Sequence, residues 1–110
     1  MTMTHFFHIH DLARSRAAKG KLYHEFLRVP AMSAGVYVLA PGSVDPQKPH
    51  SEDEMYYVVR GRARTQVGSE NAEVRAGSLI FVEAEVPHRF YDIQEELEVL
   101  VFFAPAERQF

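Results

Sequence analysis

Short apolar segments, punctuated by glycine and proline, make up most of the chain from Leu22 onward. Turn signals recur about every 8 to 12 residues, a spacing typical of all-β sandwiches and barrels. No long helical pattern separates the segments, which disfavours a parallel α/β sheet. We therefore predict an all-β domain of about eight short strands, at residues 23–29, 35–40, 55–59, 63–67, 72–75, 78–82, 88–91 and 97–103.

The segment before these strands has a different pattern. Residues 11–19 carry leucine, alanine and arginine, with Asp11 as a suitable N-cap and Gly20 directly after the end. This predicts one or two helical turns. At 110 residues the chain has room for one domain, which we divide into an N-terminal segment with a short helix, 1–20, and a β-barrel, 21–110.

Composition narrows the classes of function. Hydrophobic residues make up 46% and charged residues 25%, as in globular proteins, and the formal net charge of −3 disfavours a nucleic-acid partner. The longest apolar stretch falls far short of the roughly 18–20 residues of a membrane span, and the first residues lack the pattern of a secretion signal. We expect no membrane association and a cytoplasmic protein. The absence of cysteine excludes disulfides, cysteine-based zinc sites and thiol nucleophiles.

Three side chains have the chemistry of a metal site. His50 and Glu54 are four residues apart beside a predicted turn, and His88 follows a proline further along. Imidazole and carboxylate groups are natural ligands of zinc, iron, manganese and nickel, and two histidines with one carboxylate leave coordination positions open for a substrate. The pattern predicts one divalent metal ion. The alternative is that these are loop residues with no joint role.

The spacing of these residues resembles the two motifs of the cupin superfamily. His50 matches the second histidine of the first motif, Glu54 its glutamate and Gly61 its closing glycine, while Gly77 and His88 match the glycine and histidine of the second motif. The resemblance covers about half of the chain. It implies a cupin-type double-stranded β-helix, or jelly-roll barrel, that holds a metal ion inside.

The chain departs from the family pattern at several positions. Lys48 stands where the family usually has its first histidine, and an ammonium group cannot coordinate a metal unless it loses its proton. Water, the amide oxygen of Gln47 or the phenol of Tyr56 remain as alternatives for the missing ligand. Tyr56 and Lys48 are also candidate acid/base groups, because a nearby cation could lower the pKa of a phenol. The other departures, which should change only the shape of loops, are Gly42, Glu83, Glu85 and Asp92.

Two further groups of residues receive a structural interpretation. The tract of His5, His8 and His10 alternates with apolar residues, which indicates a frayed strand or disorder rather than a metal site.

Three arginines alternate along one predicted strand, so they share a face that we expect to lie in solvent unless a bulge at Gly61 turns it. They are Arg60, Arg62 and Arg64. Their expected partners are Glu70, Glu73 or Glu98.

These observations favour a metal-dependent enzyme that acts on a small organic molecule in the barrel by oxygenase, isomerase or lyase chemistry. A barrel that binds a metabolite or anion without catalysis is the main alternative, because one fold hosts both functions. A structural dimer without ligand is a third hypothesis. Residues 97–103 are apolar on both faces of their predicted strand, and we therefore expect a homodimer.

Overall fold

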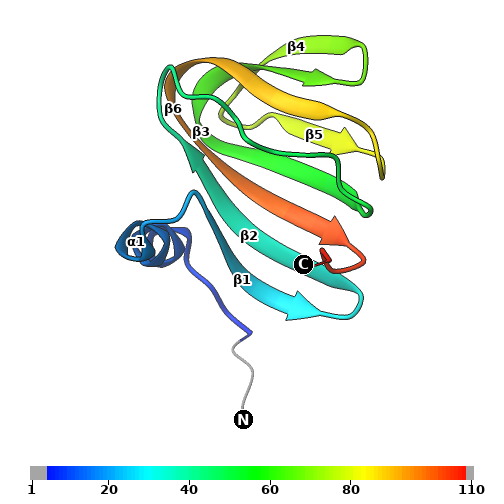
Figure 1. Cartoon of the computed structure of the whole chain (residues 1–110). Coiled ribbons are helices and arrows are strands. Elements are labelled where there is room, and N and C mark those ends of the chain that lie inside the picture. Colours follow the sequence, from blue (N-terminus) through cyan, green and yellow to red (C-terminus); the bar gives the residue numbers. More distant parts are fainter. Residues whose placement is uncertain (1–4, 109–110) are drawn as a thin grey trace.

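Antiparallel strands form most of the regular structure in a computed structural model that describes residues 5–108 (Figure 1). The strands are hydrogen-bonded in the order β1-β2-β6-β3-β4, and β5 pairs with β3. The predicted all-β class with a short N-terminal helix is confirmed. In chain order the elements are α1 (Ile9–Lys19), β1 (Tyr23–Val29), β2 (Met32–Leu39), β3 (Asp53–Val67), β4 (Glu70–Arg75), β5 (Leu79–Val82) and β6 (His88–Ala104).

Two long strands replace four of the predicted short ones. The segments expected at 55–59 and 63–67 are one strand, β3, and those expected at 88–91 and 97–103 are one strand, β6. The two strands pair along most of their length, with register shifts between Val58 and Arg64. The first part of β3 also pairs with β5, and its last part with β4. The long strands therefore curve through both walls of the barrel.

Gly61 permits this curvature. Its φ angle of 99° lies in the left-handed region, and a Cβ atom built on it would lie 2.2 Å from the carbonyl oxygen of Glu96 on β6. A side chain at this position would meet backbone that has little room to move. The pairing is irregular near Gly61, where the sequence left a bulge open, and it continues on both sides of this glycine.

Helix α1 begins earlier than expected. It starts at Ile9 with His8 as N-cap, and the side chain of His8 makes no capping hydrogen bond. The prediction of Asp11 as N-cap is therefore wrong; its carboxylate lies in the first turn, where it faces the positive end of the helix dipole. Gly20 ends the helix in the left-handed conformation, with φ 65°, as the sequence predicted.

The N-terminal histidines do not form a strand. His8 and His10 lie at the start of α1, are exposed, and stack their rings with centroids 5.8 Å apart, whereas His5 is exposed in the segment before the helix. The strand interpretation of the alternating pattern is wrong because the helix begins within it.

Among residues 5–108, no helix is long and apolar enough to cross a membrane.

Inward and outward side chains alternate along β3. Tyr56 and Val58 are buried inside the barrel, but the register shift after Val58 reverses the pattern, so that Arg60 and Arg62 lie outside. The outer arginines form ion pairs across the β3–β6 ladder, with Arg60 3.3 Å from Glu98. The remaining contacts of the three arginines are Arg60 with Glu96, Arg62 with Glu95, and Arg64 with the hydroxyl of Tyr91. Of the predicted partners, Glu98 is confirmed; within the described residues, Glu70 and Glu73 form no ion pair with these arginines.

Candidate functional site

The three predicted metal ligands meet inside the barrel. His50 lies in the loop before β3, Glu54 is the second residue of β3, and His88 is the first residue of β6. Val82, the last residue of β5, lies directly beside Glu54 in the ladder, and the chain then turns back to His88. A contact between adjacent strands and one short turn therefore brings together residues that are far apart in the sequence.

The ligand atoms of the three residues all lie within 4.8 Å of one another. A carboxylate oxygen of Glu54 is 3.1 Å from Nε2 of His88 and 3.9 Å from Nε2 of His50. The Glu54 side chain is 1% exposed, so its carboxylate has almost no access to water. This arrangement surrounds a small space with one carboxylate and two ring nitrogens.

The polar atoms at this site lack the hydrogen bonds that buried groups normally make. Among the described residues, neither carboxylate oxygen of Glu54 nor Nε2 of His88 has a hydrogen-bond partner, because the close approach of the two groups is not aligned for a bond. Burying such groups unpaired is costly. Nδ1 of His88 is 2.9 Å from the carbonyl oxygen of Val86, which can only accept a hydrogen bond, so Nδ1 carries the proton. Nε2 therefore presents a lone pair, and the residues fit a divalent cation.

Charge and burial act in opposite directions on the two histidines. Burial lowers the pKa of His88, but the Glu54 carboxylate and the Val86 carbonyl outweigh it, so the pKa lies above its ordinary value. For His50, burial again lowers the pKa, and the carboxylates of Glu107 and Glu54 outweigh it, so this pKa is also raised. At a pH below these raised pKa values, a metal ion would have to displace a proton from each ring, since only neutral imidazole binds metal.

Gln47 and Tyr56 lie at the edge of the cluster. The hydroxyl of Tyr56 donates to Oε1 of Gln47 at 2.7 Å, and the same oxygen is 3.4 Å from Nε2 of His50. Burial and the charge of Glu54 raise the pKa of Tyr56 well above its ordinary value. Lys48 is exposed, and the structure does not bring it into the cluster.

Asp45 is a functional residue that the sequence did not reveal. Its buried carboxylate accepts hydrogen bonds from the hydroxyl of Tyr37 at 2.6 Å and from the backbone of Phe90 at 2.9 Å. It also accepts from the side chain of Gln47 at 3.1 Å, which turns the amide oxygen of Gln47 toward the cluster. Asp45 thus fixes the loop that carries Gln47 and His50. An acidic residue in a proline-containing loop was the only signal, and it is common in loops without such a role.

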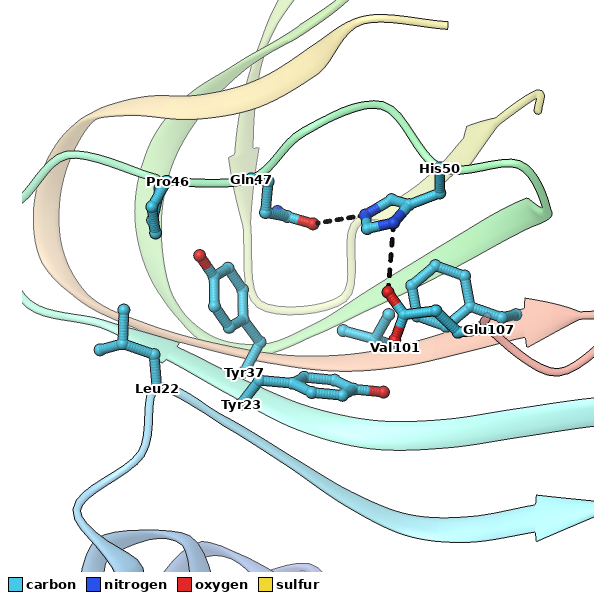
Figure 2. A pocket seen from close by; sticks show the side chains of 9 residues that line it. Leu22, Tyr23, Tyr37, Pro46, Gln47, His50, Val101 and Glu107 are labelled. Carbon is cyan, nitrogen blue, oxygen red and sulfur yellow. Dashed lines mark hydrogen bonds and ion pairs between the residues drawn. The ribbon is translucent and has the colours of Figure 1, made fainter. Parts of the chain in front are cut away.

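A cavity of about 270 Å³ opens beside His50 (Figure 2). Figure 2 shows Gln47 and Glu107 on opposite sides of the His50 ring. The hydroxyl of Tyr23 is buried and, among the described residues, has no hydrogen-bond partner. The lining is mostly aromatic and aliphatic, and consists of Leu22, Tyr23, Tyr37, Pro46, Gln47, His50, Val101, Phe103 and Glu107.

The chain is similar in sequence and structure to several known proteins. Residues 35–103 match the cupin domain family. SCO3923, an uncharacterized protein of Streptomyces coelicolor, is 48% identical over 101 residues, which cover 92% of this chain and 96% of that protein. The structure of TT1209 from Thermus thermophilus has a TM-score of 0.73 and 26% identity, covering 94% of this chain and 99% of its own. The DMSP lyase DddQ from Ruegeria pomeroyi has a TM-score of 0.67 and 18% identity, covering 80% of this chain and 49% of the lyase.

The match to the family begins in β2 and ends in β6, so it includes all three clustered side chains. The likeness to the solved structures extends over the barrel and confirms the jelly-roll fold expected from the motif spacing. The sequence motifs, the barrel fold and the family match all indicate the same family. The chain belongs to the cupin domain family.

Proposed function

We propose that this cupin is a metal-dependent enzyme whose ion is held by His50, Glu54 and His88. The observation that carries the proposal is the convergence of buried donor atoms without hydrogen-bond partners, beside a cavity. Zinc, iron, manganese and nickel all suit this donor set. When bound, the ion would polarise an oxygen atom of an organic ligand, which suits oxygenation, isomerisation or lyase chemistry.

The cavity favours a compact, uncharged substrate. Its volume of about 270 Å³ suits a small organic molecule. Among its described lining residues there is no lysine or arginine, and Glu107 contributes a carboxylate, so the lining offers an anion no cationic partner. We propose a molecule that turns an oxygen toward the ion and an apolar body toward Leu22 and Pro46. The free hydroxyl of Tyr23 would donate a hydrogen bond to a second oxygen of this molecule.

Gln47 and Tyr56 would complete the site. The amide oxygen of Gln47 is close to the ligating nitrogen of His50, which favours it for the position that lacks the family's first histidine; water and Tyr56 are the alternatives. The hydroxyl of Tyr56 donates to Oε1 of Gln47 at the edge of the cluster, and from this position we propose the phenol as an acid/base group. The exposed position of Lys48 gives no support to an acid/base role.

A barrel that binds a metabolite without converting it is the second candidate. The mostly apolar lining of the cavity favours this function. The two functions differ in what happens to the bound molecule. Metal-loaded protein can be incubated with a mixture of small metabolites and analysed by mass spectrometry. An enzyme should consume one of the compounds, whereas a binder should retain a compound on the protein without consuming it.

We also propose that a second copy of the chain covers the outer face of the barrel. Met55 and Tyr57 of β3 are each 39% exposed, and their ladder partners Phe81 and Leu79 of β5 are 53% and 68% exposed. These side chains form one continuous apolar patch across two adjacent strands. Sedimentation analysis of wild type and Phe81→Glu tests this: a dimer that becomes a monomer supports the proposal, and a monomeric wild type contradicts it.

Metal analysis of untagged protein tests the proposed site. Wild type purified without added metal should contain close to one equivalent of a divalent ion, and His88→Ala should lose it. His10→Ala removes an exposed histidine of α1 and is the matched control. Retention of the full metal content by His88→Ala would remove His88 from the site and contradict the proposal.

A further inference from the structure

The segment that follows β6 reaches back to the metal cluster. Figure 1 shows the C-terminal segment at the end of the barrel where β3 begins and β5 ends. Within this segment, a carboxylate oxygen of Glu107 lies 3.1 Å from Nδ1 of His50 (Figure 2). Glu107 is outside both motifs and outside the residues that match the family, which end at residue 103. Its contact with a ligand of the proposed ion is therefore a feature of this chain.

The backbone of Glu107 is fixed by the β1–β2 hairpin. Its N–H donates to the hydroxyl of Ser33 at 2.9 Å, and Ser33 is fully buried on β2. The guanidinium of Arg28 on β1 donates to the carbonyl oxygen of Glu107 at 2.6 Å, and the carboxylate of Glu25 holds this guanidinium at 2.8 Å. These contacts anchor both sides of the residue, so the side chain is directed at His50 by the hairpin.

The contact determines which nitrogen of His50 faces the cluster. An ionised carboxylate only accepts hydrogen bonds, so the proton on Nδ1 points to Glu107, and the lone pair of Nε2 faces the side where Oε1 of Gln47 and the carboxylate of Glu54 lie, 3.4 and 3.9 Å away. Because the two nitrogens lie on different sides of the ring, Glu107 cannot coordinate the ion that Nε2 would bind. His88 has an equivalent contact from Nδ1 to the carbonyl of Val86. Each histidine ligand thus has its own partner on Nδ1.

His50 needs such a partner more than His88 does. It lies in a loop, where the hydrogen bond from the N–H of Glu85 to its carbonyl oxygen fixes the backbone but does not decide which ring nitrogen faces the cluster. His88 belongs to β6, whose ladder fixes the residue, and its side chain is 2% exposed against 18% for His50. We propose that Glu107 is a positioning residue that holds the His50 ring in its metal-binding orientation. This inference rests on the proposed metal site.

Cobalt binding to untagged full-length protein tests the inference. Partners of metal-ligating histidines typically contribute about 10–100-fold to metal affinity, and we expect a loss of this size in Glu107→Ala. Glu107→Gln keeps the shape and an accepting oxygen, so it should lose less. Glu70→Gln, which alters an exposed carboxylate of β4, is the matched control and should bind as wild type does.

Nitrogen-15 spectra of the histidine rings in the zinc-loaded proteins provide a second readout. Wild type should show His50 protonated on Nδ1 and metal-bound through Nε2, and Glu107→Ala should show a mixture of ring states. Cobalt affinity within twofold of wild type in Glu107→Ala, together with an unchanged His50 spectrum, would overturn the role of Glu107 and leave the metal site standing. Failure of wild type to bind cobalt or zinc would overturn both proposals.

Discussion

Glu54→Gln separates a metal-binding role of this carboxylate from a structural one. Glu54 is 1% exposed, and among the described residues its oxygens have no hydrogen-bond partner. A charge buried in this way costs several kcal/mol, whereas an unpaired amide costs roughly 1–3 kcal/mol. In metal-free protein the substitution should therefore raise the free energy of unfolding by about 1–3 kcal/mol. This is the opposite of the usual effect of a substitution in a protein core.

The size of the effect depends on pH through His88. Its pKa in the folded protein is raised above the ordinary value of 6.5, so its attraction to Glu54 is fully present below that value and is lost as pH rises through the folded pKa. The increase in the free energy of unfolding caused by Glu54→Gln should therefore be smallest at about pH 6 and largest at about pH 8.5, well above the ordinary histidine pKa. Thermal unfolding with a chelator measures it, since about 1 kcal/mol corresponds to roughly 4–8 °C in domains of this size.

Metal addition should reverse the order of stability. A free metal concentration one hundred times the dissociation constant stabilises a folded protein by about 2.7 kcal/mol, which wild type should gain and Glu54→Gln should lack. Glu95→Gln, on an exposed ion pair with Arg62, should change stability by less than about 0.5 kcal/mol and serves as control. If metal-free Glu54→Gln were less stable than metal-free wild type at high pH, Glu54 would be a stabilising core residue, and the reasoning from its unpaired oxygens would be refuted.

Other expected outcomes test the site and the fold separately. Cobalt affinity should fall as pH is lowered from about 8 to 6, because the pKa values of His50 and His88 are both raised and protons compete for the rings; equal affinity across this range, measured by titration, would exclude histidine ligands. Asp45→Ala leaves four donors without an acceptor and should cost about 2–4 kcal/mol in chemical denaturation; a loss below about 0.5 kcal/mol, the range of surface substitutions, would contradict its anchoring role. Gly61→Ala should destabilise more than Gly42→Ala in thermal unfolding, since both have positive φ angles and only Gly61 meets backbone; equal losses would contradict the close approach.

The sequence alone determined the class of fold and the core of the site. Regular turn signals and strand-like segments predict an all-β domain because turn residues and apolar alternation act locally. Gly20 marked the end of the helix for the same reason. The sequence also singled out His50, Glu54 and His88, because the spacing within each of two short segments resembles a cupin motif. These predictions needed no knowledge of distant contacts.

Tertiary structure decided the length of the strands. The sequence places Gly61 between two strand-like segments, and from local signals a break and a bulge look alike. Pairing with β6 continues on both sides of this glycine and joins the segments into β3.

The start of the helix was predicted too late, at Asp11. Helix α1 begins at Ile9 without a side-chain cap, so no capping signal in the sequence marks its start.

Only the fold could reveal what supports the cluster of His50, Glu54 and His88. Asp45 reaches Phe90 across 45 positions of the chain, and Glu107 is anchored to Ser33 across 74. Such contacts depend on the closure of the barrel, which brings loops and the C-terminal segment to one end, and no local pattern encodes them. The sequence named the groups able to bind a metal; the packing of distant segments decided how those groups are oriented and what cavity they face.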